Sequence, residues 1–99
     1  MEKVEKIKKI LEEQKDELRK KYEIKEIGIF GSYLRKEQKK NSDFDILVDF
    51  ESNSRIGLLK FIELENYLSD IIGIKVDLVM KNALKPRIGQ HILREVVNI

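Results

Sequence analysis

The chain has 99 residues, which fits one small domain over residues 1–99 and leaves no room for a second. It contains no cysteine, so disulfides and thiolate chemistry are excluded. No apolar run approaches the roughly 20 residues that cross a bilayer, and the charged N-terminus does not resemble a secretion signal. We therefore expect a soluble cytoplasmic protein with no membrane partner.

The net charge of +2 hides an uneven distribution. Residues 1–40 carry 13 Lys or Arg against 9 Asp or Glu, residues 41–80 carry 3 against 8, and residues 81–99 carry 4 against 1. An acidic middle between basic ends suits a cation site whose ligand is a polyphosphate. Taken alone, however, the pattern favours an unevenly charged, solvated surface. Acids are interleaved with the basic residues, so a nucleic acid is not expected as a partner.

The first half of the chain predicts a helix, a strand and a short helix. Apolar residues three, four or seven apart predict an amphipathic helix over about 2–22. The Ile-rich segment 24–30 predicts a buried strand. Because Gly31 and Ser32 follow it, a short helix is expected from Ser32 to about Gln38, with Ser32 at or near its N-cap.

The second half predicts two strands and two helices. Residues 43–50 and 74–80 alternate between apolar and polar, as half-buried strands do. Between them, residues 58–71 predict an amphipathic helix that Gly73 ends. Pro86 suits the first turn of a last helix, along which Ile88, Ile92 and Val96 recur. The order predicts an α/β (α+β) domain with a small three-stranded mixed sheet.

Two carboxylates on one strand carry the first chemical signal. Asp43 and Asp45 lie two residues apart, so both leave the same face of the strand. Carboxylates held this close repel each other unless a proton or a cation lies between them. Oxygen ligands without a nearby His or Cys favour a hard ion such as Mg²⁺. If the strand that carries Asp77 is a neighbour, three carboxylates converge, enough for metal ligands and a base.

The Gly31–Ser32 turn carries the second signal. Glycine permits a close backbone approach, and amides at the start of a helix point at an anion. Ser32 adds a hydroxyl donor. Arg35, one helical turn further on, suits either a phosphate contact or a salt bridge to the acidic middle of the chain.

Gly31–Ser32, ten further residues, and then Asp43-Phe44-Asp45-Ile46 resemble the signature of the nucleotidyltransferase fold shared with polymerase β. The surrounding residues are similar to its smallest branch, the minimal nucleotidyltransferases (MNT), from about Ile24 to Ile99. The similarity includes Leu84-Lys85-Pro86-Arg87 near the end of the chain. That branch usually has Gly-Ser-x-Ala-Arg-Gly, whereas here Leu34 replaces the small residue and Lys36 the second glycine.

The resemblance implies a reaction in which two Mg²⁺ ions bridge the triphosphate of ATP during in-line attack at the α-phosphorus. Asp43 and Asp45 would hold both ions, and Asp77 would bind the catalytic ion and help to deprotonate the acceptor. Ser32 and the neighbouring amides would cradle the β- and γ-phosphates.

The resemblance also implies an acceptor. The chain has no further domain to hold one, so a partner or a second copy must present it. In this branch the usual partner is a HEPN-domain ribonuclease toxin, and the MNT protein is its antitoxin, which transfers AMP to a tyrosine hydroxyl. One alternative is an antitoxin that only masks its toxin. Another is transfer to RNA or a small molecule, for which no acceptor cleft or basic strip is evident.

Three other residues receive less specific predictions. Asp49 shares the face of Asp43 and Asp45 but has no motif position, so a solvated or supporting role is expected. His91, the one histidine, is expected to have a surface or packing role. Tyr33 could stack on a nucleobase or pack in the core.

Overall fold

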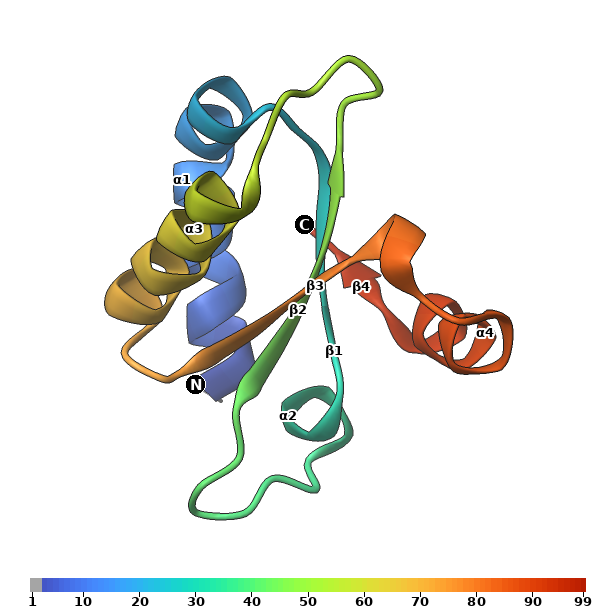
Figure 1. Cartoon of the computed structure of the whole chain (residues 1–99). Coiled ribbons are helices and arrows are strands. Elements are labelled where there is room, and N and C mark those ends of the chain that lie inside the picture. The colour runs from blue at the N-terminus through green and yellow to red at the C-terminus, as the bar shows by residue number, and fades with distance from the viewer. Residues whose placement is uncertain (1–2) are drawn as a thin grey trace.

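Two long helices cover one face of the sheet (Figure 1). The computed structural model describes residues 3–99, so Glu2, where we place the start of the first helix, lies outside the described residues. Helix α1 (Lys3–Tyr22) buries the predicted stripe at Ile7, Leu11, Leu18 and Tyr22. Helix α3 (Leu58–Ile72) ends where predicted, because Gly73 adopts a left-handed conformation with φ of 80°. Neither these helices nor any other within residues 3–99 could cross a membrane.

The sheet brings the two predicted motifs to one of its ends. Strands β1 (Ile24–Phe30), β2 (Phe44–Phe50) and β3 (Val76–Met80) are joined by β4 (Val97–Asn98) in the order β3-β2-β1-β4. Strand β1 runs antiparallel to β2, and β3 runs parallel to β2. The end of β1 therefore lies at the same end of the sheet as the starts of β2 and β3. Helix α2 (Ser32–Arg35) follows β1 at this end.

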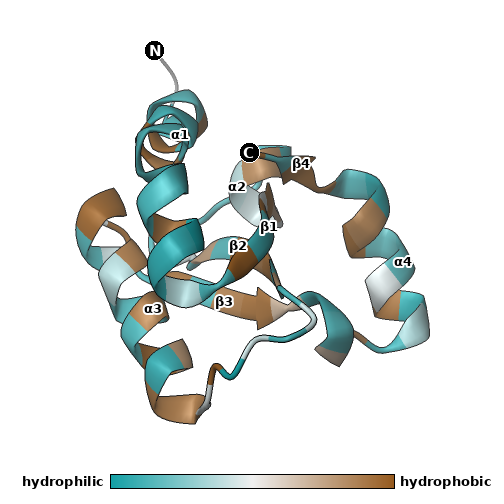
Figure 2. Ribbon diagram, turned by 90° about the horizontal axis from the view of Figure 1, so that it is seen from above, coloured by the Kyte–Doolittle hydropathy of each residue, from teal (hydrophilic) through white to brown (hydrophobic). Residues whose placement is uncertain are grey.

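The alternation predicted for the strands is confirmed. Phe44, Ile46 and Val48 are fully buried on the face that α1 and α3 cover. Asp45 and Asp49 lie on the opposite face because side chains alternate along a strand. Figure 2 shows this layering from above, with α1 and α3 on one side of the sheet and α4 (Pro86–Glu95) on the other.

The end of the chain departs from prediction, since the sheet has four strands and not three. Helix α4 stops at Glu95, and Val96, which we placed in this helix, has extended backbone angles. Val97 and Asn98 then pair with Ile29 and Gly28 of β1. A Cβ added to Gly28 would lie 2.6 Å from the Cγ2 atom of Val96. Gly28 therefore leaves room for the chain that enters β4. The recurrence of Ile88, Ile92 and Val96 predicted a helix there and gave no indication of this strand.

Three other boundaries shift by a few residues. Helix α2 ends at Arg35 instead of near Gln38, because Lys36 adopts a left-handed conformation with φ of 60°. Strand β2 begins at Phe44 and β3 at Val76, one and two residues later than predicted. A short 3₁₀ helix, η1 (Lys81–Ala83), which was not predicted, links β3 to the loop before α4.

Candidate active site

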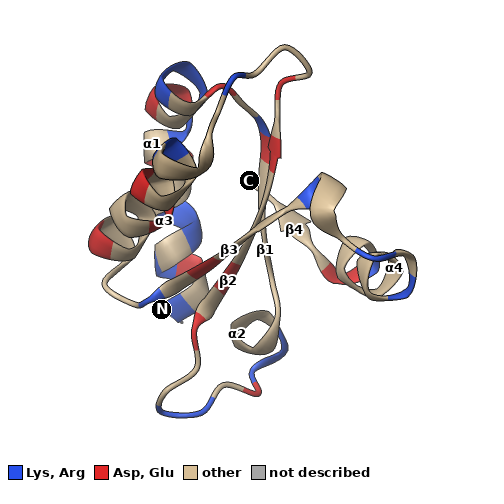
Figure 3. Cartoon of the chain, in the orientation of Figure 1, with Lys and Arg blue, Asp and Glu red and all other residues tan. Residues whose placement is uncertain are grey.

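The carboxylates of β2 and β3 lie next to each other on the face that α1 and α3 leave open. Asp45 is the register partner of Asp77 on the parallel strand β3, and of Phe30 on β1. Figure 3 shows acidic bands side by side on β2 and β3 near the end of the sheet that carries α2. Asp43 precedes β2 by one residue and is half-buried. The strand that carries Asp77 is therefore a neighbour of β2, which is the condition on which the expected convergence of the carboxylates depends.

The pKa of Asp45 responds to burial and to its charged neighbours. Burial raises the pKa of Asp45 to about 6, and repulsion from Asp77 and then from Asp43 adds to the rise. A hydrogen bond from the backbone amide of Ser32 and the charge of Arg35 act in the opposite direction. The site therefore stores unfavourable charge that a proton or a cation would relieve.

The turn after β1 requires a glycine. Gly31 has φ of 87° and ψ of −161°, a combination that is essentially restricted to glycine. A Cβ at this position would lie 1.9 Å from the Oδ2 atom of Asp45. The backbone of the turn and the Asp45 carboxylate therefore lie in direct contact.

Arg35 binds two carboxylates, neither of which belongs to the acidic middle of the chain. Its Nη1 atom lies 2.6 Å from Oε1 of Glu95, and its Nε atom lies 3.1 Å from Oε2 of Glu37. The Oε2 atom of Glu95 also accepts a hydrogen bond of 3.1 Å from the backbone N–H of Gly31. Glu95 was not predicted as a site residue. The one feature of the sequence that could have indicated it is that Glu95 is the one acid within residues 81–99.

An open cavity of about 670 Å³ lies between this end of the sheet and α4. Its polar wall holds the turn, Asp45, Arg35 and Glu95, and Ile88 and Ile92 of α4 supply an apolar wall. His91 is exposed and also lines the cavity, so its surface position is as expected. The complete lining is Phe30, Gly31, Arg35, Asp45, Ile88, His91, Ile92, Arg94 and Glu95.

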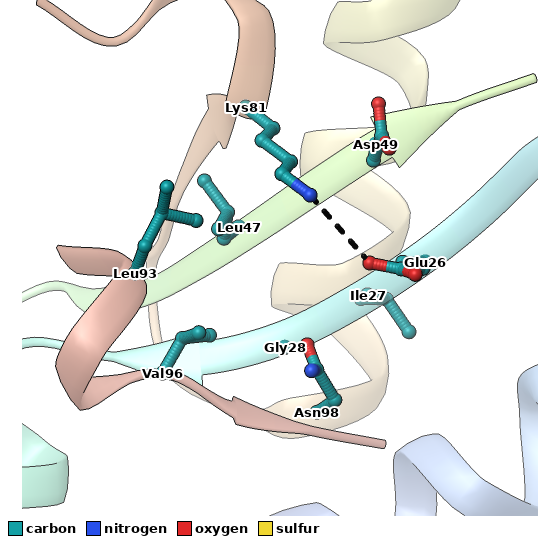
Figure 4. A pocket seen from close by; sticks show the side chains of 9 residues that line it. All are labelled: Glu26, Ile27, Gly28, Leu47, Asp49, Lys81, Leu93, Val96 and Asn98. Atoms are coloured by element: carbon teal, nitrogen blue, oxygen red, sulfur yellow. Dashed lines mark ion pairs between the residues drawn. The ribbon is translucent and has the colours of Figure 1, made fainter. Parts of the chain in front are cut away.

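A second, smaller cavity of about 220 Å³ lies further along the same sheet (Figure 4). Asp49 and Leu47 line this cavity. Across it, the Nζ atom of Lys81 lies 3.8 Å from the Oε2 atom of Glu26. Asp49 does not line the larger cavity, and it is not among the charges that shift the pKa of Asp45. This placement agrees with its lack of a motif position.

Two residues of the motif have structural roles. Tyr33 is 7% exposed, and its ring centroid lies 5.2 Å from that of Phe44, so it packs in the core. Lys36 takes a left-handed conformation at the position where the resembling branch has glycine. A left-handed conformation is one that glycine adopts more readily than lysine.

Carboxylates alone could hold a metal ion here. Within residues 3–99 no three His, Cys, Asp or Glu side chains form a ready-made metal cage. Asp45 and Asp77 are nevertheless oxygen donors at paired positions, and their repulsion is what a divalent cation would neutralise. The chemistry of these oxygen donors therefore fits a hard cation, although the side chains are not arranged in a preformed metal site.

Comparison with known proteins defines the class. Residues 11–98 match the nucleotidyltransferase domain, and the chain belongs to this enzyme family. It is 54% identical over 96 residues to the protein adenylyltransferase MntA of Thermococcus cleftensis, covering 97% of this chain and 95% of MntA. The similarity therefore extends over nearly the full length of both proteins.

Solved structures agree with this membership. A structure assigned as a minimal nucleotidyltransferase superposes with a TM-score of 0.73 at 28% identity, covering 94% of this chain and 95% of the other. A toxin–antitoxin crystal structure with AMP-PNP gives a TM-score of 0.68 at 25% identity, covering 88% and 70%. The chain is thus a nucleotidyltransferase of the minimal branch, and the predicted fold is confirmed.

Proposed function

We propose that this protein transfers AMP from ATP, in the presence of Mg²⁺, to a hydroxyl group on a partner toxin, and that it acts as the antitoxin of the pair. The observation that carries the proposal is the pairing of Asp45 with Asp77 beside the Gly31–Ser32 turn. The adenylyltransferase MntA relative and the toxin–antitoxin neighbour with AMP-PNP support the same activity.

Each residue of the site has a proposed role. Asp43, Asp45 and Asp77 hold Mg²⁺, which when bound neutralises the triphosphate and lowers the pKa of the acceptor hydroxyl. Asp77 is the most exposed of the three, so it is placed to take the proton of an acceptor that arrives from solvent. The amides of Gly31 and Ser32, the Ser32 hydroxyl and the Arg35 guanidinium bind the phosphates.

The acceptor comes from outside the chain. The cavity beside α4 has an apolar wall formed by Ile88 and Ile92, which suits a bound nucleotide. The cavity is also open, so a second protein can approach that nucleotide from solvent. The resemblance to the minimal branch implies that the partner that presents the acceptor is a HEPN-domain toxin and that the acceptor is a tyrosine hydroxyl.

Labelled ATP tests the proposal directly. Purified protein with ATP labelled at the α-phosphate, Mg²⁺ and its cognate toxin should label the toxin. Asp43→Asn should abolish labelling, because it removes one of the proposed metal ligands. Asp49→Asn is the matched control, since Asp49 lies on the same sheet face but lines the separate cavity. Labelling by Asp43→Asn at the wild-type rate would refute the proposal.

A masking antitoxin is the competing function. Leu58 and Leu59 at the start of α3 are 73% and 84% exposed, and a partner could cover them without any chemistry. Growth of cells that express the toxin with the Asp43→Asn protein separates the two functions. Neutralisation that needs Asp43 supports AMP transfer, whereas full neutralisation by Asp43→Asn supports masking.

A further inference from the structure

The carboxylate of Glu95 binds the Gly31 amide and the Arg35 guanidinium, two of the groups proposed to bind phosphate. One of its oxygens accepts the Gly31 amide at 3.1 Å, and the other lies 2.6 Å from Nη1 of Arg35. Its side chain is 20% exposed, so it is held mostly within the structure instead of lying along the surface. The two carboxylate oxygens therefore accept from one backbone amide and one guanidinium, as two oxygens of a phosphate group would.

The second amide of the turn is occupied as well. The backbone N–H of Ser32 donates to Asp45, so both amides of the Gly31–Ser32 turn are already paired with carboxylates. A triphosphate that uses this turn must replace at least one of them. Asp45 has a proposed role as a metal ligand, whereas Glu95 has none, which makes Glu95 the group that has to leave.

We propose that Glu95 is an internal competitor for the phosphate site: it holds the Gly31 amide and Arg35 in the nucleotide-free protein, and it is displaced when the triphosphate binds. This inference rests on the proposed function, because it assumes that the turn receives the phosphates of ATP. It adds a control on that site. Only an anion that binds Arg35 and the turn more strongly than a carboxylate enters, and Glu95 can return as pyrophosphate leaves.

The surroundings of Glu95 allow this exchange. Gly89 is the one buried residue of α4, and Ile88 and Leu93 are 58% and 46% exposed, so the helix is not held by a packed core. Glu95 itself lines the open cavity. Its side chain can therefore turn toward solvent while β4, which begins two residues later, stays paired with β1.

The rival role for Glu95 is positioning. If Glu95 orients Arg35 and the turn for phosphate, its removal weakens phosphate binding, whereas removal of a competitor strengthens it. Glu37 supplies the matched control. It also pairs with Arg35, at 3.1 Å, but no interaction with Gly31 accompanies this pair.

Calorimetric titration with inorganic tripolyphosphate, without divalent ions, measures the phosphate site apart from the metal site. Glu95→Gln keeps the shape of the side chain and removes its charge, so we expect tripolyphosphate to bind on the order of tenfold more tightly. Glu37→Gln should stay within about twofold of the wild type, because its ion pair is exposed. In wild-type protein, the NMR signal of the Gly31 amide should shift on titration as its acceptor changes.

The outcomes are separable from those of the AMP-transfer assay. Unchanged or weaker binding by Glu95→Gln overturns the competitor role, as does the absence of binding by both folded proteins. If AMP transfer proceeds while Glu95→Gln binds no more tightly, the proposed function stands and the competitor role fails. If Glu95→Gln binds tripolyphosphate more tightly while Asp43→Asn still labels the toxin at the wild-type rate, the competitor role stands and the proposed function fails.

Discussion

The two faces of the sheet differ in what their residues contribute. On the covered face, Phe44, Ile46 and Val48 are fully buried against α1 and α3 and supply stability. On the open face, the same strand presents Asp45 beside Asp77, where burial and repulsion raise the pKa of Asp45. The same strand thus stabilises the fold through its buried apolar residues and sacrifices stability at Asp45. Proteins often accept such a cost where a ligand is to be bound.

The largest effect is expected on the covered face. Phe44→Ala should lower the free energy of unfolding by about 3–5 kcal/mol, because it leaves a cavity in the core. Leu59→Ala is the control: Leu59 is 84% exposed, and the change should stay within roughly 0.5 kcal/mol. Urea unfolding followed by circular dichroism measures both. A loss below about 1 kcal/mol for Phe44→Ala would show that the covered face is not the source of stability.

The turn that joins the faces should be the next most sensitive. Gly31→Ala should cost at least about 2 kcal/mol, since it combines a backbone conformation unfavourable to alanine with a clash against Asp45. In Gly57→Ala, the added Cβ meets nothing within 4 Å. That variant should be neutral or slightly stabilised. Equal effects of the two changes would contradict the close contact between the turn and Asp45.

The open face should become more stable when its charge is removed. The pKa of Asp45 is about 6 in the folded protein against 3.8 ordinarily, so the folded state binds more protons between these values. Stability contributed at this position therefore falls as pH rises from about 4 to about 6. Asp45→Asn should be more stable than wild type at pH 7.5 by roughly 1 kcal/mol after allowance for solvent screening. Thermal unfolding without divalent ions should show this gain, and the gain should vanish near pH 4.

The smallest effect is expected at the left-handed residue after α2. Lys36→Gly should stabilise the protein by roughly 0.5 kcal/mol, because relief of the left-handed conformation is partly offset by the entropy of glycine. Lys40→Gly is the control. Lys40 has no positive φ, so glycine should be neutral or destabilising there. Thermal melts measure both, and destabilisation by Lys36→Gly would show that the lysine side chain matters more than the backbone.

Much of the fold could be predicted because local patterns decided it. The stripe of α1, the glycine that ends α3 and the alternation of β2 are each set by residues within a few positions of one another. The adjacency of Asp45 and Asp77 needed one further condition, that β2 and β3 be neighbours, and the crossover through α3 satisfies it.

The missed features depend on contacts distant in sequence. Strand β4 pairs with β1, which is distant in the sequence, and Gly28 of β1 leaves room for Val96. Helical periodicity cannot reveal such a contact. Glu95 meets Gly31 at a separation of 64 residues. The motif identified the carboxylates and the turn, but it contained no information on which group faces the turn from α4.

The most direct test of the account is the titration of the Asp45 carboxyl group, followed by its ¹³C NMR signal with and without Mg²⁺ and a non-hydrolysable ATP analogue. Without ligands, the pKa should be raised to about 6. With Mg²⁺ and the analogue bound, the account predicts that it falls below the ordinary value of 3.8, because a cation then favours the ionised form. A pKa that stays raised while the analogue is bound would contradict a metal site at these carboxylates.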